Sequence, residues 1–338
     1  MPTSRDETSY RPYVPLLVRQ WLDTPDPDTT HRTIEGSFVF ADISGFTRLS
    51  ERLDRIGLEG AEQVTEVIGG AFNRLLDPAY AFGGTLVKFG GDALLLFYRG
   101  ARHELRAASA ALEMRRALRS LGPIDTPAGK VVLRMSQGVH SGGFDFFLVG
   151  SSFREFIVAG AAATHVHTVE GAAGAGQIVV SSATALALPA ANLGPVKGSG
   201  RLLRGALLPL EESTQTSYEV DHDLTCFVPS ALREPIRRRA VVSEHRPATN
   251  AFIRFSGVDA LLADDPGAVT GAFADLIEDI QEAVEPRRIA VVNTDVYPDG
   301  LKIHLCAGAP VATGEDEENM LLAVRDIADR ARPLPLHV

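Results

Sequence analysis

The chain has 338 residues, of which 45% are hydrophobic and 22% are charged, and its formal net charge is −10. This composition is typical of a globular protein and excludes a charge-rich disordered chain, while the acidic balance disfavours a nucleic-acid-binding protein, which carries a basic surface. No apolar run approaches the roughly 18 to 20 residues of a spanning helix, and the N-terminus lacks the layout of a signal peptide, so a cytoplasmic protein without a membrane partner is expected.

Apolar periodicity and glycine or proline breaks predict the elements in chain order. They are a helix over 14–22, a strand over 37–43, helices over 47–76, strands over 85–89 and 93–98, a helix over 104–121, strands over 131–140, 144–149 and 156–159, a helix over 162–169 and a strand over 177–181. This alternation predicts α+β or α/β layers. Residues 1–35 are interpreted as a lead-in, and the irregular, proline-containing residues 182–245 as an inter-domain connector.

The C-terminal part of the chain repeats the first part. Ser256-Gly257 aligns with Ser44-Gly45, and a helix over 268–284 and strands over 289–294 and 301–307 recur in the same order. The length suits about two domains, at roughly 100 to 200 residues each. We therefore expect domains over 36–181 and 246–338. The second copy ends after a helix, where the first enters its next strand, so it is expected to be incomplete.

The first chemical motif places Asp42 at the end of a buried strand. Small residues follow it and begin a helix. A hard cation such as Mg²⁺ takes carboxylate oxygens together with substrate phosphates, and the free N–H groups at a helix start favour phosphate. An Asp before Ser-Gly also fits a plain cap or turn residue.

The second motif places Asp92 at the tip of the hairpin, in Lys88-Phe-Gly-Gly-Asp92. A hairpin beside the first strand would bring Asp92 within metal-bridging distance of Asp42. Gly-Gly-Asp by itself also fits a simple turn. Both motifs in this order, with a helix between them, are far more specific than either alone.

Asp42-Ile-Ser-Gly-Phe-Thr47 and Lys88-Phe-Gly-Gly-Asp92-Ala resemble the two metal-binding motifs of class III adenylate/guanylate cyclases. The likeness is greatest to the tandem-domain, bicarbonate-responsive soluble adenylyl cyclases and their bacterial relatives. It covers residues 36–181 well and 246–330 weakly. The resemblance implies an α+β fold of two ferredoxin-like or palm-type domains, each a mostly antiparallel sheet with helices. These domains would pair face to face within the chain, the second being degenerate and incomplete.

The resemblance also implies two-metal conversion of ATP or GTP into the 3′,5′-cyclic nucleotide and pyrophosphate. Asp42 and Asp92, with the Ile43 carbonyl, would hold two Mg²⁺ or Mn²⁺ ions. The groups implied for the triphosphate are the backbone N–H groups of Ser44, Gly45, Phe46 and Thr47 and the side chain of Arg134. An exposed strand arginine fits Arg134 equally well.

The chain also departs from the family pattern, in which one domain supplies the metals and its partner supplies a lysine, an Asn and an Arg. Thr164 and Thr168 stand where Asn and Arg are expected in the first copy. In the second copy, the two metal carboxylates and the base-reading lysine are replaced, in that order, by Arg254, Gly300 and Asn293. The second copy is therefore expected to bind no metals, and the sequence does not choose between ATP and GTP.

In the soluble adenylyl cyclases the second pocket binds bicarbonate through a lysine, a valine carbonyl region and an arginine. Lys88 and Val158 match, but His167 stands at the arginine position. A protonated imidazole holds an anion, although a histidine packed on a helix face also fits. Bicarbonate or a similar anion is thus an expected regulator. The alternative function is a catalytically inactive cyclase-like module that binds nucleotide or a small anion.

Overall fold

The computed structural model describes residues 10–44, 46–55, 57–127, 129–205, 222–238, 246–330, 334 and 336–337. The chain forms two compact units, and each unit is built from segments that are not contiguous in the sequence. Unit I comprises Ile34–Gly143 and His165–Ser217, and unit II comprises Met1–Thr33, Phe144–Thr164 and Tyr218–Val338. Within the described residues, none of the helices combines the length and the apolar character needed to cross a membrane.

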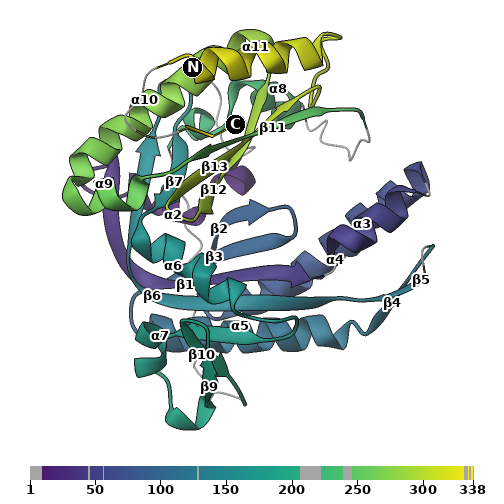
Figure 1. Ribbon diagram of the computed structural model, residues 1–338, viewed down its shortest axis with the longest axis vertical. Coiled ribbons are helices and arrows are strands. Elements are labelled where there is room, and N and C mark those ends of the chain that lie inside the picture. Colours follow the sequence, from purple (N-terminus) through teal and green to yellow (C-terminus); the bar gives the residue numbers. More distant parts are fainter. Residues whose placement is uncertain are drawn as a thin grey trace. The chain divides into compact units, whose positions relative to one another are not determined.

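Unit I is built on a sheet with the strand order β2-β3-β1-β6-β8-β10-β9 (Figure 1). The strands are β1 (His31–Ser44), β2 (Thr85–Gly90), β3 (Ala93–Arg99), β6 (Arg134–Val149), β8 (Ile178–Ser181), β9 (Leu193–Lys197) and β10 (Gly200–Leu203). Neighbours pair antiparallel in β1–β3, β2–β3, β8–β10 and β9–β10, whereas β6 and β8 are parallel. A separate hairpin is formed by β4 (Pro123–Thr126) and β5 (Gly129–Val132).

Helices cover this sheet because both layers have an apolar face to bury. They are α3 (Phe46–Asp54), α4 (Leu58–Ala81), α5 (His103–Ser120), α6 (Ala161–Gly171), α7 (Ser182–Leu186) and the short 3-10 helix η2 (Ala190–Asn192). Leu75 of α4 and Ala111 of α5 are fully buried with Leu96 and Val139 of the sheet. One core therefore holds the sheet and its two longest helices together.

Two stretches differ from the sequence-based expectation. Residues 182–203, expected to be an irregular connector, contain α7, β9 and β10, and β10 pairs with β8 in the sheet. The hairpin is short and broken by Pro195, which hides the strand alternation. The strands expected over 131–140 and 144–149 are instead one long β6 from Arg134, because Gly142-Gly143 interrupts the apolar pattern without interrupting the strand.

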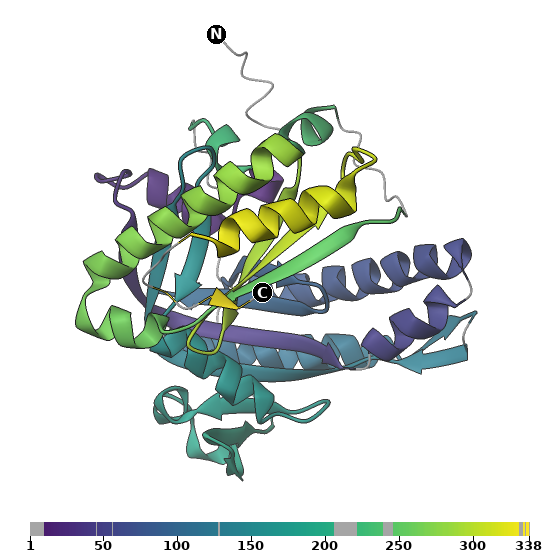
Figure 2. The ribbon, with the colours of Figure 1, turned by 45° about the horizontal axis from the view of Figure 1, so that its top comes forward.

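Unit II is built on a second antiparallel sheet with the order β12-β13-β11-β14 (Figure 2). Its strands are β11 (Thr249–Phe255), β12 (Ala290–Tyr297), β13 (Gly300–Ala307) and the two-residue β14 (Leu336–His337), which was not expected. The helices are α2 (Leu16–Leu22), α8 (Ser230–Arg237), α9 (Val258–Asp264), α10 (Pro266–Val284) and α11 (Asp316–Ala328), with 3-10 helices η1 (Arg11–Tyr13), η3 (Thr225–Phe227) and η4 (Glu285–Arg287).

The core of unit II joins segments that are distant in sequence. Strand β7 (Glu155–Ala159) pairs antiparallel with the end of β6. Phe147 and Ile157 of this pair lie in one buried cluster with Phe273 and Ile277 of α10. The Asp265 side chain caps α10 by accepting from the N–H groups of Gly267 and Ala268. The segment 144–164 therefore belongs to the core of unit II.

The hairpins of the two sheets share one irregularity. A bulge lies between Leu86 and Lys88 in β2, and Lys88 then pairs with Leu95. A bulge also lies between Val291 and Asn293 in β12, and Asn293 then pairs with His304. The strand orders β2-β3-β1-β6 and β12-β13-β11-β14 follow the same pattern along the chain.

Candidate active site

The end of β1 and the turn of the β2–β3 hairpin bring Asp42 and Asp92 together in unit I. Asp42 pairs with Ala93 across the antiparallel ladder, and the Ile43 N–H donates to the Asp92 carbonyl over 2.9 Å. Gly91 makes the preceding turn with a φ of 65°, which favours glycine. The backbones of the two aspartates are therefore neighbours at one end of the sheet.

Partial burial gives Asp42 unusual electrostatics. Burial, together with the negative charges of Asp92 and Glu170, raises the pKa of Asp42 to about 6. Like charges in a partly desolvated place disfavour ionisation of each other, and functional sites are where such shifts gather. A bound cation would relieve both costs.

Glu170 is the neighbour that the sequence did not predict. It lies half-buried on α6, where burial raises the pKa of its carboxyl group and a hydrogen bond with Ser136 lowers it. A side chain at Gly138 would place its Cβ only 2.4 Å from the Glu170 nitrogen, so α6 packs directly on the backbone of β6. Gly138, a glycine inside β6, was the one signal of this close approach.

Among the described residues, no three His, Cys, Asp or Glu side chains gather in a way that could hold one ion. The candidate ligands are therefore the pair Asp42 and Asp92. Ile43 can offer only its backbone carbonyl to a cation, because its side chain is a hydrocarbon.

Of the residues expected at the triphosphate, the structure describes Ser44 and Arg134 with their side chains. Ser44 is half-buried at the end of β1, and α3 begins at Phe46. Gly45 and the side chains of Phe46 and Thr47 lie outside the described parts of the structure. Arg134 is exposed at the first position of β6.

The residues expected to hold a regulatory anion are divided between the units. Lys88 follows the bulge of β2 in unit I, and the His167 ring packs 4.6 Å from the Phe40 ring in the same unit. Val158 is a buried residue of β7 and belongs to unit II. The anion site stays a prediction.

In unit II, the residues that the sequence aligns with the two metal motifs, or their neighbours, make contacts with protein groups. Arg254 donates to the Tyr297 hydroxyl over 2.8 Å and lies over its ring. The Asp299 carboxylate accepts from the N–H groups of Gly257 and Asp259, at 2.9 and 3.3 Å. The Asp299 N–H in turn donates to the Thr164 hydroxyl over 3.1 Å. Thr164 thus has a structural partner within its own unit.

Residues 30–204 match the family of the adenylate and guanylate cyclase catalytic domain. This match covers more than half of the chain, so the chain belongs to this family, the class III nucleotide cyclases.

Individual relatives match smaller parts. Adenylate cyclase type 10 of Oryctolagus cuniculus is 26% identical over 155 residues, which are 44% of this chain and 9% of that protein. The Homo sapiens protein of the same name is 37% identical over 78 residues, which are 21% and 5% of the two chains. This chain thus spans about a tenth or less of the length of these relatives. Among solved structures, the guanylyl cyclase Cya2 is 25% identical, with a TM-score of 0.45, over 55% of this chain and 99% of that chain.

Proposed function

We propose that this chain supplies the metal-binding half-site of a cytoplasmic nucleotide cyclase, which converts ATP or GTP into the 3′,5′-cyclic nucleotide and pyrophosphate. The observation that carries the proposal is the backbone contact between Ile43 and Asp92. Because of this contact, two carboxylates meet at the end of one sheet, in a chain of this family. The raised pKa of Asp42 supports a functional role for the pair.

The pair fits divalent cations because it offers oxygen ligands of like charge in a partly buried place. Asp42 and Asp92, with the Ile43 carbonyl, would hold two Mg²⁺ or Mn²⁺ ions. When bound, such ions neutralise triphosphate charge and make the ribose 3′-hydroxyl a better nucleophile. The half-buried position of Asp42 excludes part of the water that would otherwise screen these charges.

The protein's own contribution to the triphosphate is positioning. The residues at the start of α3, Ser44 to Thr47, would donate backbone N–H groups to phosphate oxygens, which is a general property of a helix start. The exposed Arg134 would pair with the triphosphate, because a guanidinium matches two phosphate oxygens. Both groups orient the α-phosphorus for attack and departure of pyrophosphate in line.

We propose further that a first domain starting near residue 36 is followed by a degenerate second copy from residue 246, and that the two pair within the chain. The shared strand order and the bulge before both Lys88 and Asn293 support the alignment. The register modifies one expected correspondence. Asp42 pairs with Ala93 and Arg254 with Lys302, so Leu301, not Gly300, takes the place of Asp92. Neither metal carboxylate has a counterpart.

The test compares metal-dependent triphosphate binding by the parent chain and by Asp42→Asn and Asp92→Asn. Calorimetry with Mn²⁺ and non-hydrolysable ATP and GTP analogues should show binding by the parent and a loss of at least tenfold in each variant, because a charge-assisted contact contributes roughly 1.5 to 3 kcal/mol. The matched control is Asp77→Asn, which alters an exposed carboxylate of α4. If all four proteins bind alike, the metal-site assignment is wrong. Binding without cyclic nucleotide would favour the inactive module.

A further inference from the structure

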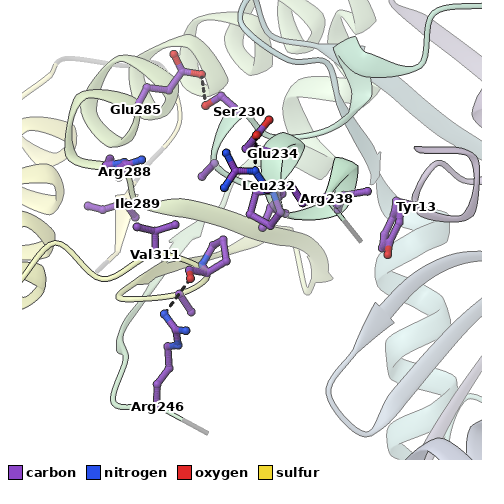
Figure 3. A pocket seen from close by; sticks show the side chains of 15 residues that line it. Tyr13, Ser230, Leu232, Glu234, Arg238, Arg246, Glu285, Arg288, Ile289 and Val311 are labelled. Carbon is purple, nitrogen blue, oxygen red and sulfur yellow. Dashed lines mark hydrogen bonds and ion pairs between the residues drawn. The ribbon is translucent and has the colours of Figure 1, made fainter. Parts of the chain in front are cut away.

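A cavity of about 780 Å³ opens in unit II and is lined by none of the residues assigned a role above (Figure 3). Its walls come from α8, from η4 with the start of β12, and from the loop that follows β13. Ligand pockets typically have volumes of about 300 to 1,000 Å³. The cavity therefore has room for a small organic molecule.

One part of the lining is apolar. Leu232 of α8, Ile289 before β12 and Val311 after β13 all face the cavity. Ile289 is 2% exposed and is held by a backbone bond from its N–H to the Val284 carbonyl. Val311 remains 37% exposed. The buried Ile289 and the partly exposed Val311 thus form an apolar surface on which a hydrocarbon group can be buried.

The other part of the lining is charged, with Arg238, Arg246 and Arg288 against Glu234 and Glu285. Glu234 accepts from both Arg237 and Arg238, at 2.5 and 2.6 Å. Glu285 accepts from the Ser230 hydroxyl at 3.2 Å. These contacts engage both carboxylates at the wall.

Two further guanidinium groups, those of Arg246 and Arg288, line the cavity. Arg246 donates to the carbonyl oxygens of Pro310 and Gly308, at 2.9 and 3.4 Å, which holds its charge beside the cavity. Arg288 has a left-handed backbone with a φ of 56°. Within the part of the chain that the structure describes, no carboxylate or carbonyl accepts a hydrogen bond from the Arg288 guanidinium. Such a group beside an apolar floor favours an anion.

We propose that this cavity binds a small monocarboxylate with an apolar body. The carboxylate pairs with Arg288 and Arg246, and the hydrocarbon part packs on Leu232, Ile289 and Val311. A monoanion is the matching charge, because three arginines and two glutamates line the cavity in a chain that is otherwise strongly acidic. None of its lining residues is assigned a part in the proposed nucleotide chemistry.

The experiment titrates the full chain with octanoate by calorimetry, with acetate and octanol as the charge-only and apolar-only probes. Octanoate should bind saturably at one site, and acetate and octanol should each bind at least tenfold more weakly. Arg288→Ala should weaken octanoate at least tenfold, as expected for a lost charge-assisted pair. Val311→Ser should weaken octanoate but leave acetate unchanged, and the partial exposure of Val311 limits the effect of this substitution on folding.

Arg116→Ala is the matched control, because it removes an exposed arginine of α5 that pairs with Glu113 in unit I. It should bind octanoate like the parent. Thermal melts of all three variants establish that they are folded. The proposal is overturned if octanoate does not saturate, if octanol binds as tightly as octanoate, or if a folded Arg288→Ala binds octanoate with the parent's affinity.

Discussion

At the scale of single residues, the partly buried carboxylate of Asp42 lowers the stability of the protein when it is ionised, although the proposed metal site needs its charge. Its folded pKa of about 6 lies above the unfolded value of about 4. Between these pH values the folded state binds more protons than the unfolded state. The stabilising contribution of Asp42 is therefore complete below about pH 4 and is lost as the pH rises through 6. At neutral pH the ionised Asp42 therefore costs stability, which a bound cation would restore.

The corresponding variant, Asp42→Asn, should be more stable than the parent at pH 7.5 in a chelating buffer. The gain should be about 1 to 2 kcal/mol, after a discount for the exposed side of the carboxylate, and should appear as a rise in Tm of about 2 to 4 °C. At pH 4 the difference should vanish, and Mn²⁺ should reverse its sign by stabilising only the parent. Equal melting of both proteins at pH 7.5 without metal would contradict this account of Asp42.

His140 also changes the stability of the protein in this pH range. The variant must therefore be compared with the parent at each pH. Burial, together with the neighbouring His165, lowers the pKa of His140 to about 4. Its Nδ1 lies 2.9 Å from the Ser181 hydroxyl, in a buried polar cluster. This contribution to stability is complete above about pH 6.5 and is lost as the pH falls towards 4, opposite to that of Asp42. Because both proteins contain His140, its contribution cancels when the stability of the variant is subtracted from that of the parent.

At the scale of elements, the contact between α6 and β6 decides which charges surround Asp42. Gly138 makes this contact, because its absent side chain leaves room for the backbone of Glu170. The helix could not approach the strand as closely with any larger residue at this position. The position of Glu170 therefore depends on a glycine in a different element.

Gly138→Ala should destabilise the protein by about 1 to 3 kcal/mol, the usual cost of overpacking. The new Cβ would lie 2.4 and 2.7 Å from the nitrogen and Cα of Glu170, which are backbone atoms and yield only if α6 moves. Gly142→Ala is the matched control in the same strand, because its Cβ would have no neighbour closer than 3.8 Å. Urea unfolding of the two variants measures the difference, and equal midpoints would show that α6 adapts freely.

At the scale of the whole molecule, the proposed catalytic residues are unevenly distributed. Unit I contains both carboxylates, whereas in the proposed alignment unit II has Arg254 and Leu301 at their positions and Asn293 at that of the base-reading lysine. Thr164 is engaged by the backbone of Asp299. The groups proposed to bind the ground state therefore lie in unit I. Among the described residues at the aligned positions, none is the Asn, Arg or Lys that the family resemblance implies for the transition state.

This chain by itself should therefore bind metal and triphosphate but form little cyclic nucleotide. Loss of groups that stabilise transition-state charge typically costs about 100-fold or more in rate, while ground-state binding survives. The measurement is cAMP and cGMP formation with Mn²⁺, beside an active class III cyclase as the positive control and Asp92→Asn as the background. Turnover within about tenfold of the active enzyme would mean that other residues perform this work.

The sequence by itself determined the features that depend on neighbouring residues. The strand before Asp42, the glycine turn before Asp92 and the order of the main helices and strands follow from local periodicity and turn chemistry. The meeting of the two aspartates was also predictable, because a hairpin paired with the first strand leaves few places for its tip. The motifs around them carried the family resemblance that the match over residues 30–204 confirms.

Only the tertiary structure decided which distant segments share a core. It placed Glu170 beside the aspartates, added β9 and β10 to the sheet, and packed residues 144–164 into unit II. It also formed the cavity from α8, η4 and the loop after β13. These arrangements result from many weak packing contacts between residues far apart in the chain. A local pattern contains no record of such contacts, because burial of an apolar face does not specify which partner covers it.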